Sequence, residues 1–307
     1  MSFDASEEPH SAAYFDPLRD FWWNHDYLQL LASRLGLGAV QSALDVGAGV
    51  GHWGALLLPL LAADASLVGV EREPRWVERA RERATEPGIS DRCRYLQGVA
   101  ESLEFDDETF DLVTCQTLLI HVADVPAVLG EMCRVLRPGG LLLAAEPNNL
   151  AGILVADSTT GNHSIDELVE RVAFALICER GKAALGEGDN SVGDLAPGYF
   201  AQAGLIDIQT FLNDMTFALV PPYASPAQQA LRTVLLEDAA SERWGGQSAS
   251  DVKRRYLAGG GTADEFEPRW QRRLSETREV ARQLTANQLH TAGGGIQYIV
   301  SGRRSPQ

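Results

Sequence analysis

The sequence predicts an α/β protein whose core is a mostly parallel, seven-stranded sheet with helices on both faces. Short apolar runs alternate with amphipathic helical stretches, at intervals that suit β-α-β units. A glycine-rich turn follows the first of these runs, and two further strand candidates lie near the carboxyl end. The chain has 307 residues, 45% of them apolar, so it is long enough to bury a large core.

The elements of this core can be placed in order along the chain. Pro74 opens one predicted helix. Asp124 caps a second, and the Arg-Pro-Gly-Gly sequence at 137–140 ends it. Parallel strands buried on both faces are expected to be continuously apolar. The five runs predicted as parallel strands are 42–46, 66–70, 94–97, 110–114 and 141–145.

Three regions lie outside this alternating pattern. An aromatic amphipathic segment covers 14–35, helical material is expected at 164–185, and a polar, helix-rich stretch covers 226–289. The last two strand candidates, 206–212 and 296–301, flank that stretch. We therefore expect three parts: an amino-terminal helical lid (1–36), a core (37–215 with 293–307), and a helical insertion (216–292) that serves as a substrate cap or a dimer face.

The chain is strongly acidic, with 26 Lys plus Arg against 42 Asp plus Glu and a net charge of −16. Binding to nucleic acid or to an anionic membrane surface depends on basic residues, so neither partner is expected. No apolar run approaches the roughly 20 residues that span a bilayer, and the first residues do not resemble a signal peptide. The four cysteines are far apart in the sequence and read as buried thiols. The predicted location is cytoplasmic.

The strongest chemical signal follows the first strand, where three alternate glycines lead into a helix. Backbone N–H groups can approach a ligand closely at such a turn. Gly49-x-Gly51-x-x-Gly54 also matches the dinucleotide fingerprint, so an NAD(P)-dependent oxidoreductase is the alternative enzyme. Asp45 argues against it, because it lies inside the strand where a dinucleotide fold usually has an apolar residue.

With this Asp-x-Gly-x-Gly-x-Gly pattern, residues 43–147 resemble the class I S-adenosylmethionine-dependent methyltransferases, in particular a bacterial small-molecule branch. The resemblance implies a Rossmann-like fold, S-adenosyl-L-methionine as cofactor, and S-adenosyl-L-homocysteine as product. It implies that the glycine loop holds the methionine part, and that Glu71, after the second strand, accepts hydrogen bonds from both ribose hydroxyls. A carboxylate suits that role because it can accept two hydrogen bonds from a diol.

A second family motif, Gly-Asp-Ala-Glu-x-Leu-x-Phe, corresponds to 98–105, where Val99 replaces the aspartate that receives the adenine amino group. The resemblance further implies that the segment after the fourth strand faces the transferring methyl, and that an aromatic lid covers the cofactor. The predicted cofactor-binding residues are Tyr14, Trp22, Asp45, Gly47, Ala48, Gly49, Gly51, Glu71, Arg72, Val99, Ala100, Glu101, Gln116, Thr117 and His121.

Methyl transfer from a sulfonium is an in-line displacement in which positioning contributes most. A general base is needed only when the nucleophile arrives protonated, and the predicted candidates are His121, His25 and Glu146. No metal site is predicted, since the sequence lacks a compact acidic ligand cluster. The expected acceptor is a small organic molecule methylated on oxygen, nitrogen or sulfur, with carbon as a further alternative. A homodimer and a non-catalytic S-adenosylmethionine-binding protein both remain open.

Overall fold

The computed structural model describes residues 17–85 and 91–306, and they fall into two compact units. The first, the core unit, comprises 25–153, 182–214 and 295–307. Within the described residues, the second, the helical unit, comprises 17–24, 154–181 and 215–294. Each unit is described by itself below.

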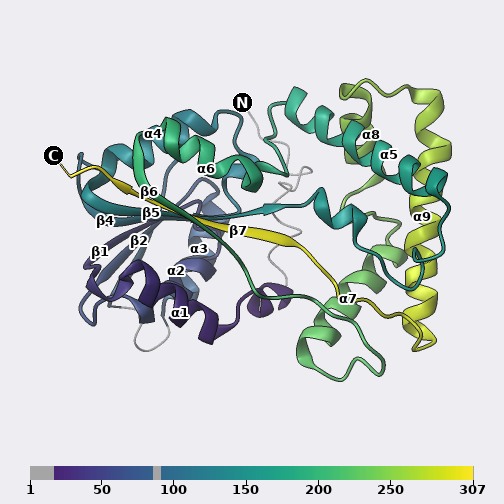
Figure 1. Cartoon of the computed structure of the whole chain (residues 1–307), viewed down its shortest axis with the longest axis horizontal. Helices are drawn as coiled ribbons and strands as arrows, with labels where there is room; N and C mark the ends of the chain where they lie inside the picture. The colour runs from purple at the N-terminus through teal and green to yellow at the C-terminus, as the bar shows by residue number, and fades with distance from the viewer. Residues whose placement is uncertain (1–16, 86–90, 307) are drawn as a thin grey trace. The chain divides into compact units, whose positions relative to one another are not determined.

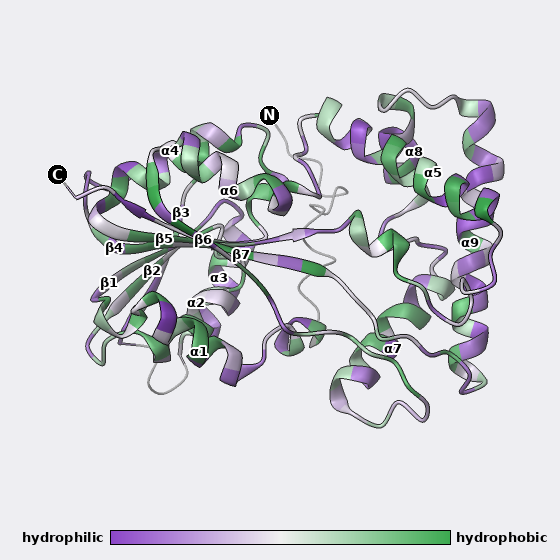
Figure 2. Cartoon of the chain, viewed as in Figure 1, coloured by the Kyte–Doolittle hydropathy of each residue, from purple (hydrophilic) through white to green (hydrophobic). Residues whose placement is uncertain are grey.

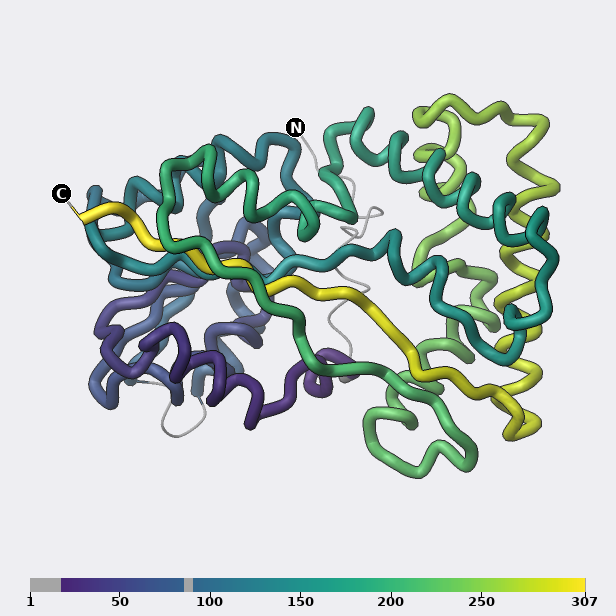
Figure 3. Tube along the Cα trace, in the orientation of Figure 1, coloured from purple at the N-terminus to yellow at the C-terminus, as the bar shows by residue number. Residues whose placement is uncertain are grey.

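The core unit contains a seven-stranded sheet in the order β3-β2-β1-β4-β5-β7-β6. Strands β1 to β5 are parallel, whereas β7 is antiparallel to both β5 and β6. Figure 3 shows the yellow carboxyl-terminal strand running alongside its two partners. The strands are β1 (Ser42–Val46), β2 (Ser66–Glu71), β3 (Cys93–Gln97), β4 (Phe110–Gln116), β5 (Leu136–Asn148), β6 (Leu205–Leu212) and β7 (Ile296–Arg304).

Helices cover both faces of this sheet. Helices α1 (His25–Leu35), α2 (His52–Leu57) and α3 (Pro74–Arg83) lie on one face, and α4 (Val125–Val135) and α6 (Val192–Gln202) lie on the other (Figure 1). The central strands are apolar along most of their length, as Figure 2 shows for β4 and β5, and their side chains are buried. A parallel sheet covered on both faces requires such strands.

The structure confirms the α/β class and the predicted strands, with ends that differ by a few residues. The largest difference is β5, which starts at Leu136 because Phe110 of β4 pairs with Leu136 ahead of the bulge between Phe110 and Leu112. Asp124 caps α4 as predicted, with its side chain accepting from Ala127 N at 3.0 Å. Pro74 is the first residue of α3.

The helical unit is built around aromatic side chains. Its elements are α5 (Ile165–Ala184, whose last residues belong to the core unit), α7 (Pro226–Ala240), α8 (Ala249–Ala258) and α9 (Ala263–Thr285). Phe174 of α5 stacks on Tyr256 of α8, with ring centroids 5.3 Å apart. Phe266 and Trp270 of α9 stack in turn at 6.0 Å. Such aromatic pairs add to the stability that area burial provides.

The structure divides the chain differently from the three predicted parts at two places. Helix α1, expected in the amino-terminal lid, belongs to the core unit, and Tyr27 Oη donates to Leu212 O of β6 at 2.7 Å. Residues 154–181, expected in the core, belong to the helical unit, because Phe174 and Cys178 pack into its apolar cluster.

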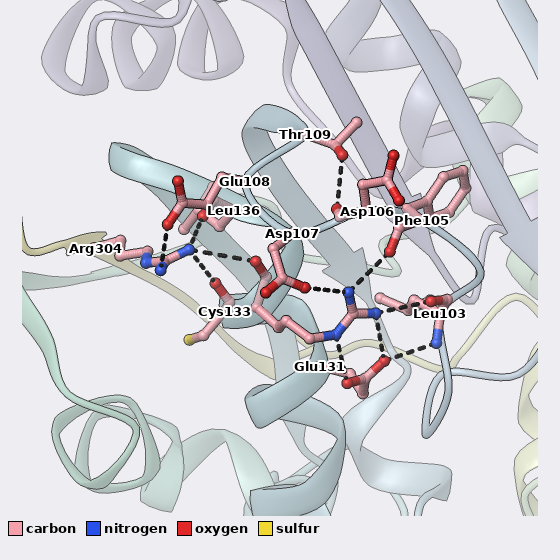
Figure 4. Close-up of polar contacts among 11 residues, drawn as sticks. Leu103, Phe105, Asp106, Asp107, Glu108, Thr109, Glu131, Cys133, Leu136 and Arg304 are labelled. Atoms are coloured by element: carbon pink, nitrogen blue, oxygen red, sulfur yellow. Dashed lines mark hydrogen bonds and ion pairs between the residues drawn. The ribbon is translucent and has the colours of Figure 1, made fainter.

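Two arginines tie helix α4 to neighbouring segments of the core unit (Figure 4). The Arg134 guanidinium donates to Leu103 O and Phe105 O, both at 2.8 Å, and makes a two-pronged contact with Glu131. Arg304 Nη1 donates to the carbonyls of Cys133 and Leu136 at the end of α4. Cationic donors satisfy carbonyls that a helix end leaves unpaired. These contacts fix the segment that leads from β3 to β4.

Acid should weaken this linkage. The hydrogen bonds from Arg134, with that from Leu103 N–H, lower the pKa of Glu131 from its ordinary 4.5 to about 2. The stabilisation is therefore present above pH 4.5 and lost as the pH falls towards 2. We expect Glu131→Gln to lower the free energy of unfolding by about 2 kcal/mol at pH 7. Urea titrations should show this difference narrowing below pH 4.5, and a difference independent of pH would contradict the assignment.

Candidate functional site

Five parallel strands of the core unit end at one edge of the sheet, and most of the predicted cofactor residues follow directly after them. The glycine loop follows β1, Glu71 ends β2, the turn containing Val99 follows β3, and Thr117 follows β4. The sheet order reverses between β1 and β4. Ligands of open α/β folds bind at such a switch point, beyond the carboxyl ends of the strands.

The glycine loop is closely packed against two neighbours. Gly51 has a φ of +76°, and a Cβ built there would lie 2.5 Å from Tyr95 Oη and 2.7 Å from its Cζ. Gly47 has a φ of +70°, and its Cβ would lie 2.7 Å from Leu118 Cδ1. Side chains are therefore excluded on both conformational and steric grounds. The loop backbone lies against β3 on one side and against the loop after β4 on the other.

Glu71 is half-buried, and its carboxylate contacts the glycine loop. Oε2 accepts from Gly49 N, and Oε1 accepts from Glu73 N, each at 2.9 Å. A carboxylate has about four acceptor positions, so about two remain for further donors. This side chain can therefore brace the loop and still receive a vicinal diol.

Asp45 is buried within β1 and contacts the start of the following helix. Its Oδ2 accepts from Gly54 N in α2 at 3.1 Å. Nearby, Trp53 Nε1 donates to Thr114 Oγ1, which donates to Leu143 O. These bonds join α2 to the sheet, so Asp45 sets where the glycine loop ends and the helix begins.

The segment after β3 places an apolar surface beside Glu71. Gly98 N donates to Glu71 O at 3.0 Å, and Ser102 N donates to Val99 O, closing a turn at 99–102. Val99 is 40% exposed, so a large apolar side chain faces the surface at this turn. Ala100 is half-buried and Glu101 is exposed. The position that lacks the expected aspartate thus offers an apolar contact.

The end of β4 carries a buried donor. Gln116 is 4% exposed, and within the described residues its Nε2 has no hydrogen-bond partner. Buried polar groups are normally paired, so this atom is suited to a ligand acceptor. Thr117 has a φ of +51°, uncommon for a residue other than glycine. His121 is half-buried and ends the short 3-10 turn η5 (Leu119–His121).

Glu146, predicted as a catalytic base, is fully buried and accepts hydrogen bonds from the loop after β4. Its carboxylate accepts from Leu118 N and Leu119 N, each at 2.9 Å, and from Ile120 N at 3.3 Å. Burial raises the pKa of Glu146 to about 7, and the backbone N–H groups oppose that rise. As observed, this side chain orders a loop and presents neither oxygen to an open surface.

Other predicted residues lie at different places. Ala48 is buried in the glycine loop, and Arg72 is exposed after β2, 3.5 Å from Glu73. His25 is exposed at the first residue of α1. Trp22 belongs to the helical unit, where Arg19 lies 5.0 Å from its ring centre. Tyr14 lies outside the described residues.

Sequence reasoning missed Lys182. This lysine is 1% exposed, and its Nζ donates to Ile120 O at 2.7 Å and to Asn190 Oδ1. The available signal was composition, since Lys182 is one of only two lysines in the chain. The polar loop 186–191 is packed against the same carbonyl, because a Cβ on Gly188 would be 2.2 Å from Ile120 O.

Two absences concern the described residues alone. Among 17–85 and 91–306, no helix is long and apolar enough to cross a bilayer. Over the same ranges, no three His, Cys, Asp or Glu side chains are grouped so that they could hold a metal ion.

A cavity of about 400 Å³ lies in the helical unit, lined in part by Asp157, Ser158 and His290.

Comparison with known proteins shows what the part of the chain that carries this site is similar to. Residues 44–144 match a family model described as a methyltransferase domain. An uncharacterized methyltransferase of Bacillus subtilis is 36% identical over 108 residues, 35% of this chain and 41% of that protein. Methyltransferase GfsG of Streptomyces halstedii is 37% identical over 116 residues, 38% of this chain and 41% of the relative. The matches thus span about two fifths of these relatives.

A solved structure shares the fold, and further relatives carry methyltransferase names. A Bacillus halodurans structure described as a methyltransferase superposes over 92% of this chain and 99% of that one, with a TM-score of 0.51 and 18% identity, and so shares the fold. Further relatives are named as sterol and as ubiquinone/menaquinone C-methyltransferases. Residues 44–144 are thus similar to the methyltransferase domain of these relatives, in agreement with the resemblance that the sequence motifs carry.

Proposed function

We propose that this chain transfers a methyl group from S-adenosyl-L-methionine to a small organic acceptor by in-line displacement. The observation that carries the proposal is the gathering, at one sheet edge, of the glycine loop, the Glu71 carboxylate and the Val99 turn. These three features suit the three parts of the cofactor: a polar amino-acid tail, a ribose diol and an apolar adenine ring.

Each feature has a distinct role in this proposal. Glu71 accepts the ribose hydroxyls with the acceptor positions that Gly49 and Glu73 leave open. Val99 packs against the adenine ring. Asp45 acts on the cofactor through the loop, whose junction with α2 it fixes. The unpaired Gln116 Nε2 supplies a donor at the same edge. The bound cofactor supplies an electrophilic methyl group on a sulfonium.

Of the three predicted bases, His121 suits a proton-accepting role best. It lies on the loop that follows β4, next to the switch point of the sheet. Glu146 is committed to backbone N–H groups, and His25 is exposed at the start of α1. Because positioning dominates methyl transfer, His121 is needed only for acceptors that arrive protonated.

The acceptor is proposed to be a small molecule, since the relatives named above include enzymes of sterol and quinone methylation. Those relatives are named as C-methyltransferases, so carbon stands beside oxygen, nitrogen and sulfur as an atom that could accept the methyl group. We further propose that the helical insertion serves as a substrate cap or a dimer face. The net charge of −16 supports an acceptor that is not a nucleic acid.

The oxidoreductase alternative is disfavoured by the sheet. The dinucleotide-binding fold has the strand order 3-2-1-4-5-6 with parallel strands, whereas here the antiparallel β7 lies between β5 and β6. The non-catalytic alternative retains one supporting observation, the missing side-chain acceptor at Val99. Both alternatives make different predictions for ligand titration.

Titration calorimetry tests the proposal. The intact chain is expected to bind S-adenosylmethionine and to give no heat with NAD(P)H. Glu71→Ala should weaken binding by at least about tenfold, because it removes the diol acceptor and the brace on Gly49. Glu82→Ala is the matched control: it removes the same charge from the exposed face of α3 and should leave binding unchanged.

Three results would count against the proposal. Equal binding by wild type and Glu71→Ala would mean that the cofactor site is misplaced. Binding of NAD(P)H in preference to S-adenosylmethionine would support the oxidoreductase. Tight binding of S-adenosylmethionine with no methyl transfer to any small-molecule acceptor, in a screen with radiolabelled donor, would support the non-catalytic alternative.

A further inference from the structure

A loop in the core unit is held by two buried charged side chains of opposite sign. The loop is 117–121, between β4 and α4, and it includes η5. At its beginning, three consecutive backbone N–H groups, those of Leu118, Leu119 and Ile120, donate to the Glu146 carboxylate. Glu146 is 0% exposed, so these contacts, with the Cys115 thiol 3.6 Å from Oε1, replace its hydration.

The other end of the same segment meets a cation. Lys182 Nζ donates to Ile120 O at 2.7 Å and also to Asn190 Oδ1. Every other cationic side chain of the core unit is an arginine, and Lys253 lies in the helical unit. A compact ammonium with three donors suits this enclosed position better than the planar fork of arginine. Asn190 O in turn accepts from Asn149 N after β5.

The backbone dipoles of this loop face both charged side chains in favourable orientations. Each peptide unit carries its positive end on N–H and its negative end on C=O. Residues 118–120 point N–H groups at the anion, and the Ile120 carbonyl points at the cation. A buried charge is costly unless its partners are in place, and here each charge is compensated partly through the segment that it shares with the other. Removing either side chain therefore frees one end of the shared segment.

The segment held in this way lies against the glycine loop. Leu118 lies so close to Gly47 that a Cβ there would come within 2.7 Å of Leu118 Cδ1. On the other side, the backbone of Gly188 is packed against the Ile120 carbonyl. The loop is thus fixed between the cofactor loop and the segment 182–191, and its last residue is His121.

From these contacts we infer that Glu146 and Lys182 are a pair of positioning residues, which clamp 118–120 at opposite ends and so hold Leu118 against the first glycine of the cofactor loop. The inference rests on the proposed function, because the glycine loop that Leu118 contacts is the loop proposed to bind S-adenosylmethionine. Lys182 lies far in sequence from every family motif, so only the structure shows this role.

Hydrogen exchange in the cofactor-free chain tests the clamp directly. At pH 8, Lys182→Met and Glu146→Gln should each speed exchange of the Leu118, Leu119 and Ile120 amides by at least about tenfold. Amides of α9 in the helical unit should be unaffected. Lys253→Met, which removes the exposed lysine, is the control and should leave all of these rates unchanged.

Lysine labelling of the unmodified protein gives a second readout that does not depend on a variant folding. With an N-hydroxysuccinimide ester, Lys253 should react at least about tenfold faster than Lys182, as measured by mass spectrometry. Glu146→Gln should raise the reactivity of Lys182 relative to Lys253. Equal reactivity of the two lysines in the wild-type chain would overturn the inference.

Cofactor affinity links the clamp to the site. Lys182→Met should weaken S-adenosylhomocysteine binding by about fivefold or more, whereas Lys253→Met should not. Wild-type exchange rates at 118–120 in Lys182→Met, or unchanged affinity despite faster exchange, would refute the inference. Because exchange and labelling are read without cofactor, failure of the wild-type chain to bind S-adenosylmethionine would instead count against the proposed function.

Discussion

Gly51→Ala is expected to weaken S-adenosylmethionine binding by at least about tenfold and to destabilise the core unit. The new Cβ would lie 2.5 Å from Tyr95 Oη and 2.7 Å from Cζ, and the aromatic ring is 4% exposed. A rigid, buried ring cannot move aside without displacing its neighbours. The loop must therefore shift away from β3, and Glu71 loses its contact with Gly49. Calorimetry and urea unfolding together measure both effects.

Gly139→Ala provides a matched control for backbone strain. Its φ is +75°, against +76° at Gly51, and a Cβ there meets nothing within 4 Å. It precedes the buried part of β5, at the opposite end of that strand from Glu146. We expect a loss of about 1 kcal/mol in stability from the left-handed backbone and no change in affinity. Equal losses of affinity in both variants would show that loop packing on Tyr95 is not what positions the cofactor site.

As the pH rises from 4.5 to above 7, the free energy of unfolding of the wild-type chain should fall by about 3 kcal/mol more than that of Glu146→Gln. The pKa of Glu146 is raised from 4.5 to about 7, mainly by burial. A group with a raised folded-state pKa stabilises the fold fully below its unfolded pKa, and that contribution is lost as the pH rises through the folded one. Each pKa unit corresponds to about 1.4 kcal/mol.

Urea titrations of both proteins between pH 5 and 8 measure this difference. The two curves need not coincide at pH 5, because glutamine cannot accept from three N–H groups as a carboxylate does. The prediction concerns the change with pH alone. Parallel pH profiles would mean that the carboxylate is charged throughout, and that burial does not control its titration.

Much of the core was predictable because its sequence signals are local. Apolar runs, the Asp124 cap and Pro74 each specify an element through contacts within a few residues, and the structure has all of them. Strand ends were less predictable. Strand β5 begins at Leu136, ahead of the predicted run, because pairing with Phe110 continues past a bulge that no local pattern announces.

The cofactor part of the site was equally accessible. Parallel strands bring their carboxyl ends to one edge, so motifs that follow successive strands must come together. Gly47, Glu71 and Val99 illustrate this, because each lies at or just after the end of a strand. The Glu71 carboxylate accepts from Gly49 N, and its backbone carbonyl accepts from Gly98 N. The position of the site was therefore implied once the strand order was recognised.

Tertiary structure alone decided the rest, because the deciding contacts join residues far apart in the chain. The sequence placed Glu146 correctly at the end of β5, yet only packing directed its carboxylate to the backbone of 118–120. Lys182 has no local motif, and its partner Ile120 lies 62 residues earlier. Likewise, aromatic packing assigned 154–181 to the helical unit. Local patterns determined the elements and the glycine loop, whereas burial of charge and of apolar surface determined which distant residues hold them in place.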